Sequence, residues 1–442
     1  MKFFNIHIER SERINLQNID KNRCKYGYLL IFACFFIYMS SMAAKGIFAA
    51  EQKYIADLWL NGQNRLASMA NTFYFVPYGL IQIVLFFIMK KINIFKYVII
   101  TVPIAAVSTI LIGTATNIYQ IWIYFGLSGL FQGAIYCGCN YALTQNLPTK
   151  LCTTANMVMN TAYALGTVLA YSICALSLSF NQEGLWRLPY FIIGGMFLLS
   201  VLVFALVLNK AKRFKHINEM MDAKILLEEK KKDANVDKPL ISIDTKSKTI
   251  IFYTLLLLIT FLVTSLYYSV MNYVTTLLVG IYKLPDNISI YVSIIAPIAI
   301  FLGPMMTISS CEKDKNFIRQ GVIFLSILLP IPILLYFLYN VNIIIALILV
   351  LAFVVLANGI KAICISIIAF KMKNQLNTAA FSAITNAVAS IAAGVAPTVI
   401  GAIIDASGWQ TAYLTIFIVA LVTLIITFIV NVCVTNSNKK LQ

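Results

Sequence analysis

The sequence predicts an all-α, polytopic membrane protein whose twelve transmembrane helices form two six-helix bundles. Three observations support this fold class. The 442 residues are 60% hydrophobic and only 12% charged, whereas soluble domains carry about 25% charged residues. The apolar residues gather into twelve runs of roughly 20 residues or more, the length that crosses the hydrocarbon core of a bilayer as a helix. One long hydrophilic segment then divides these runs six and six.

The expected elements follow in order along the chain. An N-terminal tail (residues 1–26) precedes the first bundle (27–209), a central loop (210–248), the second bundle (249–434) and a C-terminal tail (435–442). The near-equal lengths of the bundles suggest parallel repeats. The apolar runs lie at 27–50, 66–90, 96–115, 119–145, 154–180, 187–209, 249–281, 287–310, 317–339, 342–370, 378–404 and 409–434.

The basic residues indicate the orientation of the chain. The net charge is +17, and on the assumption of a cytoplasmic N-terminus the inner segments hold 28 Lys and Arg while the outer loops hold 4. This asymmetry is the positive-inside signature. It predicts cytoplasmic termini in a plasma (inner) membrane, with lipid as a partner, and it accounts for the positive charge without a nucleic-acid ligand.

Two basic residues remain inside the apolar runs, Lys45 in the first and Lys361 in the tenth. A lysine at the bilayer centre costs about 2.5–3.5 kcal/mol on insertion scales, so such residues commonly serve a function. We expect both to meet a negatively charged substrate in a central cavity. Two alternatives stay open: Lys45 could reach the outer head groups, and Lys361 could bond facing carbonyls.

The acidic residues contribute a second expectation. All seventeen Asp and Glu lie in loops, in tails or at predicted helix ends, where Glu51, Asp57 and Asp405 are found. Proton-coupled carriers usually place a carboxylate or histidine within the membrane. The sequence therefore predicts a cationic cavity without a proton relay.

Polar residues form stripes at helical spacing on several predicted helices, and each stripe fits either a cavity wall or helix packing. The substrate-binding candidates on these stripes are Tyr74, Tyr78, Gln132, Tyr136, Asn160, Tyr163, Tyr267, Tyr268, Asn272 and Asn386. The nine cysteines are scattered and neither histidine lies in an apolar run, so we expect no catalytic residues, metal site or cofactor, and no enzyme.

Several stretches resemble the major facilitator superfamily and, within it, the organophosphate:phosphate antiporters. "KGIFA" resembles the first-helix motif of that family and puts Lys45 at its substrate-binding arginine. "GLFQGAIYCGCN", with Gln132, is similar to its fourth helix, and "LWRLPYFIIGG" and "DASGWQTAYLTIF" resemble the ends of its two halves. The resemblance implies two six-helix bundles, alternating access and a phosphorylated substrate.

The seventh run departs from that family. "YYSVMNY" has Tyr267 where the family has its second substrate arginine and Asn272 where it has an aspartate. Lys361 could restore the second positive charge from the tenth helix. Gln132 lies about where related anion symporters carry an acid, which favours exchange over proton symport.

The resulting hypothesis is a monomeric secondary transporter of a small organic anion, a phosphorylated metabolite or a carboxylate, that works by alternating access and by exchange. One alternative is a carrier of a neutral or cationic solute, or a drug exporter. A second alternative, from another class, is a transporter-like membrane sensor that acts through its central loop.

Overall fold

The computed structural model describes the backbone of residues 2–88, 92–147, 149–180, 184–212, 246–313, 317–367 and 378–439, with side chains described from residue 27 except in short stretches. Every regular element in these ranges is a helix. The helices are α1 (Lys2–Trp59), α2 (Asn64–Ile88), α3 (Ile94–Ile112), α4 (Ile118–Gln132), α5 (Ile135–Asn146), α6 (Thr149–Ser179), η1 (Leu185–Arg187), α7 (Leu188–Lys212), α9 (Lys246–Met271), α10 (Val274–Gly280), α11 (Asp286–Ser293), α12 (Ile295–Ala299), α13 (Leu302–Lys313), α14 (Phe317–Leu328), α15 (Pro330–Leu338), α16 (Ile343–Ala362), η2 (Ile363–Ile367) and α18 (Thr378–Lys439).

These elements fit twelve membrane crossings. Ten segments of the described chain are long and apolar enough to span a bilayer, and the last of them, Ala383–Thr435, has 53 residues and crosses twice. The twelfth crossing is α2, which has 25 residues. Several crossings are interrupted, so that α4 and α5, α9 and α10, α11 to α13, and α14 and α15 each share one. The predicted fold class is therefore confirmed.

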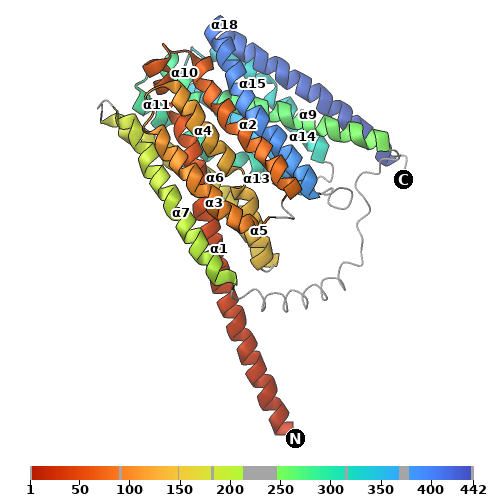
Figure 1. Ribbon diagram of the computed structural model, residues 1–442. Coiled ribbons are helices and arrows are strands. Elements are labelled where there is room, and N and C mark those ends of the chain that lie inside the picture. Colours follow the sequence, from red (N-terminus) through yellow and green to blue (C-terminus); the bar gives the residue numbers. More distant parts are fainter. Residues whose placement is uncertain are drawn as a thin grey trace.

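The two crossings inside α18 are separated by a turn at Gly408. This residue has φ +79° and ψ 179°, a backbone conformation that side chains other than glycine rarely adopt. The two arms of α18 meet at an apex there and then diverge (Figure 1). The predicted break between residues 404 and 409 corresponds to this turn.

Asparagine side chains begin three of the helices. The Asn93 carboxamide accepts hydrogen bonds from the backbone of α3, and Asn117 and Asn342 do the same for α4 and α16. Asparagine is favoured at this position because its side chain occupies amide groups that the first turn of a helix leaves unpaired. The short polar breaks of the sequence thus set where these spans start.

The N-terminal tail continues the first crossing as one helix, because α1 runs unbroken from Lys2. In Figure 1 it projects beyond the bundle past the end of α7. The apolar crossing itself begins at Gly27. Residues 213–245 of the predicted central loop and residues 440–442 of the C-terminal tail lie outside the described chain.

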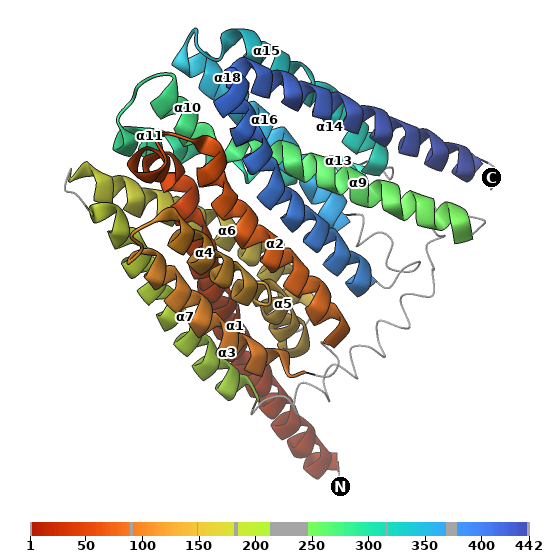
Figure 2. The same ribbon diagram turned by 45° about the horizontal axis from the view of Figure 1, so that its top comes forward.

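The two halves meet along two pairs of helices. The first arm of α18 packs against α2, and α11 and α12 pack against α6; Figures 1 and 2 show α2 beside α18. Small residues permit the first of these contacts. A Cβ at Gly79 would lie 2.9 Å from the Ala387 carbonyl oxygen, and one at Gly394 would lie 3.1 Å from the Phe75 Cβ. Glycine at these positions therefore allows two backbones to approach closely.

Candidate functional site

A cavity of about 930 Å³ lies between the two halves. This volume is at the upper end of the range found for small-molecule sites. Its walls come from α1, α2, α5, α6, α9, the break between α12 and α13, α13 itself, α16, η2 and the first arm of α18. The charged, aromatic and amide residues on these walls include Tyr38, Lys45, Tyr74, Phe75, Tyr78, Tyr136, Tyr163, Tyr268, Asn358, Lys361 and Asn386.

Both intramembrane lysines reach this cavity, and their ammonium groups lie over aromatic rings. The Lys45 nitrogen lies 4.9 Å from the ring centre of Phe75, 5.1 Å from that of Tyr163 and 5.8 Å from that of Tyr268. The Lys361 nitrogen lies 4.0 Å from the ring centre of Tyr267 and 5.4 Å from that of Tyr268. Ring faces attract cations because their π electrons make them partly negative.

Tyr268 connects the two lysines. Because both nitrogens lie within 6 Å of its ring centre, they are at most about 11 Å apart. Among the described residues that line the cavity there is no aspartate or glutamate. The aromatic rings therefore take the place of counter-ions, and the cavity presents two positive charges to whatever enters it.

The structure brings most of the predicted site residues to the cavity. Besides the two lysines, the predicted residues on its wall are Tyr74, Tyr78, Tyr136, Tyr163, Tyr268 and Asn386. Tyr267 is fully buried behind this wall, with its ring against the Lys361 ammonium group. Asn272 is buried between α9 and α10 and does not line the cavity. The Asn160 side chain lies outside the described part of the structure.

Gln132 is held inside the first half and does not line the cavity. Its side-chain oxygen accepts hydrogen bonds from the hydroxyl groups of Ser41 at 2.6 Å and Tyr74 at 3.0 Å. Its side-chain nitrogen donates to Ser128 at 2.7 Å. The contacts joining α1, α2 and α4 through Gln132 give it a packing role, while Tyr74 connects it to the cavity wall.

Several wall residues were not among the predicted site residues, and Tyr38, Phe75 and Asn358 are three of them. Tyr38 precedes Lys45 by seven residues, which is two helical turns, so the spacing on α1 would have identified it. Phe75 is apolar, so a search for polar residues at helical spacing does not select it. The Asn358 amide donates to the Ile300 carbonyl at 2.9 Å, where the α12–α13 break leaves that oxygen available, and the break itself could not be located from the sequence.

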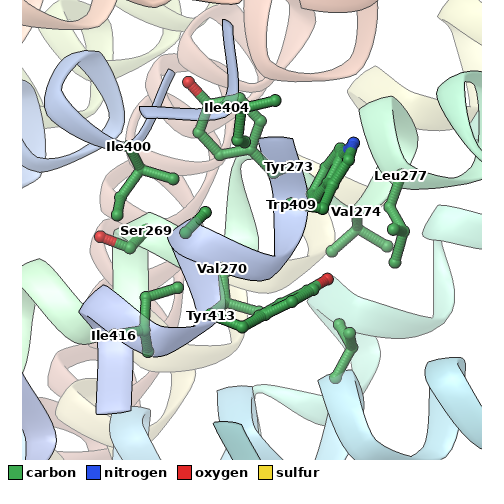
Figure 3. Close-up of a pocket in the computed structure, with 12 residues that line it drawn as sticks. Ser269, Val270, Tyr273, Val274, Leu277, Ile400, Ile404, Trp409, Tyr413 and Ile416 are labelled. Carbon is green, nitrogen blue, oxygen red and sulfur yellow. The ribbon is translucent and has the colours of Figure 1, made fainter. Parts of the chain in front are cut away.

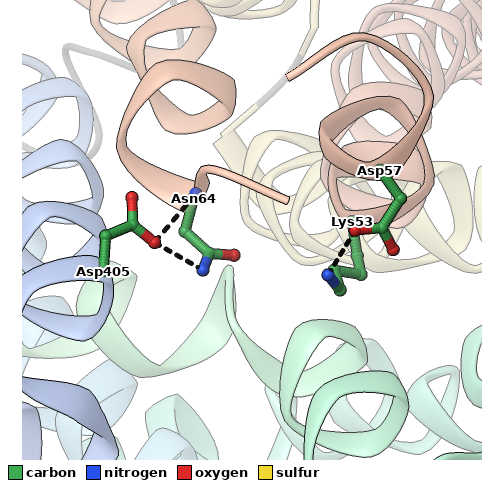
Figure 4. Close-up of polar contacts among 4 residues, drawn as sticks. All are labelled: Lys53, Asp57, Asn64 and Asp405. Carbon is green, nitrogen blue, oxygen red and sulfur yellow. Dashed lines mark hydrogen bonds and ion pairs between the residues drawn. The ribbon is translucent and has the colours of Figure 1, made fainter. Parts of the chain in front are cut away.

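The cavity is closed on the side of the molecule away from the termini. There the Asp405 carboxylate on α18 accepts hydrogen bonds from the backbone amides of Asn64 and Arg65 at 3.0 and 2.8 Å, and from the Asn64 side chain at 2.8 Å. Figure 4 shows Asp405 facing the start of α2. A carboxylate at this position also interacts favourably with the partial positive charge of the helix N-terminus.

Further polar contacts lie in the same layer, and two of them, Tyr273 to Ser68 and Asn287 to Ser179, join the two halves. The Tyr273 hydroxyl bonds Ser68 of α2 and donates to the Pro397 carbonyl of α18 at 2.6 Å. The Asn287 amide of α11 donates to the Ser179 hydroxyl of α6 at 3.3 Å. We call these contacts, with those of Asp405, the lock. The wall residues of α1 and α2 lie on the termini side of it, so the cavity extends toward the termini.

The expectation that Glu51 lies at a helix end is wrong. Helix α1 continues to Trp59, eight residues further, and Glu51 is completely buried. Neither of its carboxyl oxygens has a hydrogen-bond partner among the described residues. The first bundle therefore contains a buried carboxyl group, and the inference that no acid lies deep in a helix does not hold.

A second, much smaller cavity of about 10 Å³ lies between α9, α10, α16 and α18. Its walls are largely apolar, and Figure 3 shows the rings of Trp409 and Tyr413 on one side of it. This volume is about the minimum that holds one water molecule. It is a packing defect beside the lock and offers no room for a substrate.

Comparisons with known proteins agree with this architecture. The profile of the Major Facilitator Superfamily matches residues 27–385. Among solved structures, a bacterial homolog of the human lysosomal transporter Spinster, in an inward-facing and occupied conformation, has a TM-score of 0.68 at 14% identity, with 93% of this chain and 98% of that chain covered. No curated protein matches the sequence.

Two further solved structures have similar scores. A D-xylose–proton symporter has a TM-score of 0.67 at 12% identity, over 92% of this chain and 97% of that one. The nucleoside transporter NupG has a TM-score of 0.63 at 13% identity, over 91% and 98%. At sequence identities this low, the similarity shows that the folds agree and carries no information about the substrate.

Proposed function

The chain belongs to the Major Facilitator Superfamily and is an integral, multi-pass membrane transporter of that type, and on this premise we propose that it carries a small organic anion by alternating access. The substrate class is a phosphorylated metabolite or a carboxylate. The observation that supports the proposal is the pair of lysines on one cavity with aromatic rings as their only charge-compensating neighbours among the described wall residues.

The position of Lys361 adds support. Tyr267 occupies the place of the second substrate arginine in the resembling antiporters, and the Lys361 nitrogen lies 4.0 Å from its ring centre. The positive charge is thus supplied from α16 instead of α9, at nearly the same point in the cavity. A lysine is a compact charge without the two-pronged geometry of arginine, so we expect weaker discrimination between phosphate and carboxylate.

The same charges favour exchange. Two ammonium groups at most about 11 Å apart repel each other by on the order of 1–2 kcal/mol at an effective dielectric constant of about 20. A bound anion removes this repulsion and permits the cavity to close around it, whereas the empty cavity closes at a cost. The loaded carrier therefore reorients more readily than the empty one. In this proposal the carrier works as a monomer in the plasma (inner) membrane with both termini in the cytoplasm.

The test is counterflow in proteoliposomes with labelled phosphate esters, carboxylates and sugars. We expect at least one anion class to exchange, and Lys361→Met to abolish that exchange while the protein still reaches the membrane. Lys283→Met is the matched control, because Lys283 is exposed in the turn after α10 and lies away from the cavity.

Two results would contradict the proposal. Unchanged anion exchange by Lys361→Met would make this lysine structural. Exchange of neutral or cationic solutes that is insensitive to both lysines would favour a carrier of that other class. If no solute exchanges and a protein partner is retained on the purified carrier, a sensor becomes the better description.

A further inference from the structure

The wall of the large cavity is rich in aromatic rings. Eight of its 27 described lining residues are tyrosine or phenylalanine, a share more than twice the 13% of aromatic residues in the whole chain. Contacts with the Lys45 ammonium group account for three of the eight, Phe75, Tyr163 and Tyr268. Charge compensation therefore does not explain the other rings on the wall.

Three of the remaining rings form a group that we call the tyrosine cluster: Tyr38 of α1, Tyr78 of α2 and Tyr136 of α5. The ring centres of Tyr38 and Tyr136 lie 5.5 Å apart at an interplanar angle of 46°, and Tyr78 lies near both rings. All three residues are half-buried and line the cavity. The tyrosine cluster therefore presents part of its aromatic surface to the space inside the cavity.

The tyrosine cluster lies on the termini side of the lysines. Tyr38 precedes Lys45 by seven residues on α1, which is about 10 Å along the helix axis. Helix α2 runs in the opposite direction, and on it Tyr78 follows Phe75, whose ring centre lies 4.9 Å from the Lys45 nitrogen. Both helices thus place the cluster beyond the charged groups, in the part of the cavity that extends toward the termini.

The cavity consequently has a cationic end and an aromatic end. The cationic end fits the charged group of an anion. The aromatic end fits a flat ring, because aromatic rings attract one another at centre distances of about 4.5–7 Å. The volume of about 930 Å³ accommodates both parts of such a ligand, since pockets of about 300–1,000 Å³ enclose drug-sized molecules. A phosphate ester of three carbon atoms would leave the aromatic end empty.

Two other kinds of ligand that contact aromatic rings fit this cavity less well. A quaternary ammonium group binds between tyrosine rings, but two lysines share this cavity, and its described walls carry no aspartate or glutamate to offset a third positive charge. A saturated sugar ring lacks the π electrons that make a pair of aromatic rings favourable.

We propose that the substrate is an aromatic anion, a phosphate ester or carboxylate whose charged group meets Lys45 and Lys361 while its planar ring packs on the tyrosine cluster. This inference rests on the proposed function, since it keeps the two lysines as the anion site and adds a second contact region. The tyrosine cluster then determines which anions are carried. An anion without a planar ring lacks the second set of contacts and binds more weakly.

The test compares phenyl phosphate with cyclohexyl phosphate, which have the same charge and nearly the same size. Affinity is measured on the purified full-length protein from the rise in melting temperature with ligand concentration. We expect phenyl phosphate to bind about three- to tenfold more tightly, as one ring pair contributes. Burial of apolar surface alone would favour the cyclohexyl compound, which carries more of it. Phenylacetate and cyclohexylacetate provide the same comparison for carboxylates.

Variants separate the ring contact from the charge contact. Tyr136→Leu and Tyr38→Leu should each reduce the preference for phenyl phosphate to less than twofold, with little change in the affinity for cyclohexyl phosphate. Tyr136→Phe keeps the ring and should keep the preference. Tyr119→Leu is the matched control, because Tyr119 is exposed on α4 and does not line the cavity. Lys361→Met should weaken the binding of both phosphates equally.

The outcomes distinguish this inference from the proposed function. Equal affinity within both ligand pairs, or a preference for phenyl phosphate that Tyr136→Leu and Tyr38→Leu leave intact, would overturn the role of the tyrosine cluster while the anion carrier remains. If none of the four anions raises the melting temperature, both proposals are overturned. A rise produced by choline instead, and lost in Tyr136→Leu, would identify the cluster as a cation site.

Discussion

The ammonium nitrogen of Lys361 lies 4.0 Å from the ring centre of Tyr267. The lysine comes from α16 and the tyrosine from α9, so this contact fixes the charge at a defined height in the wall of the cavity. Tyr267 has no exposed surface, and its ring therefore acts on the lysine and not directly on a substrate. The role that the sequence predicted for Tyr267 is consequently proposed to be indirect.

We predict that Tyr267→Phe leaves the protein as stable as wild type, because the ring face is retained and the hydroxyl has no hydrogen-bond partner among the described residues. Tyr267→Leu should lower the free energy of unfolding by about 2 kcal/mol or more, since a desolvated cation–π contact and ring packing are lost. Thermal unfolding in detergent measures both. Equal losses in the two variants would mean that the hydroxyl, and not the ring, matters.

We predict that Asp405→Asn weakens the lock. The variant keeps the size of the side chain but loses the negative charge at the N-terminus of α2, and removal of such a cap costs about 1 kcal/mol. The population with the lock open should rise about fivefold. The rate of hydrogen–deuterium exchange in peptides covering residues 62–72, which hold the start of α2, reports this change.

Asp57→Asn provides the comparison for that experiment, because Asp57 pairs with Lys53 on its own helix and makes no hydrogen bond across the halves in the described structure. A rate that rises equally in the two variants would indicate a general effect of surface charge. A rate that rises only in Asp405→Asn supports the lock.

We predict that Gly79→Ala disturbs the packing of α2 against α18. The added methyl group would lie 2.9 Å from the Ala387 carbonyl oxygen, and overpacking of this kind costs about 1–3 kcal/mol. Gly195→Ala is the matched control, since a Cβ there meets no atom within 4 Å and replacing glycine within a helix stabilises by up to about 1 kcal/mol. The two variants should shift the melting temperature in opposite directions.

We predict that Gln132→Ala reduces stability but leaves anion affinity nearly unchanged in the folded fraction. The substitution removes three hydrogen bonds inside the first half and leaves Ser41, Tyr74 and Ser128 without this partner. Each buried polar group left unpaired costs about 1–3 kcal/mol. Melting temperature, and its increase with added anion, separate the two effects; a lost anion response at full stability would make Gln132 a binding residue.

Much of the fold could be predicted from the sequence because the bilayer demands about 20 apolar residues for each crossing, and length and composition alone report that. Lys45 and Lys361 were recognisable for the same reason, as costly exceptions within apolar runs. The direction in which a helical side chain points was harder to predict. Gln132 and Tyr74 belong to equally convincing polar stripes, yet only Tyr74 lines the cavity, because the relative rotation of neighbouring helices depends on the packing of many apolar side chains.

Glu51 shows a second limit of prediction from the sequence, which concerns where a helix ends. The run of apolar residues fades near Ala50, so composition placed the helix end there, whereas α1 continues to Trp59. The additional turns are stabilised by tertiary contacts such as the Trp59–Trp186 ring pair, whose centres lie 5.3 Å apart. Contacts between residues so far apart in the sequence produce no periodic pattern in the local sequence. The burial of Glu51, which depends on the continuation of α1, could therefore not be predicted.

Helix α2 carries both the lock and part of the cavity wall on one rod of 25 residues, which at 1.5 Å per residue is about 37 Å long. A tilt of about 5° around its middle moves its two ends in opposite directions by roughly 1.6 Å each, enough to break hydrogen bonds of the lengths found at Asp405. A small displacement of α2 at Tyr78, in the cavity wall, is therefore sufficient to break the hydrogen bonds between Asp405 and the start of α2. No separate element is needed to connect the cavity with the lock.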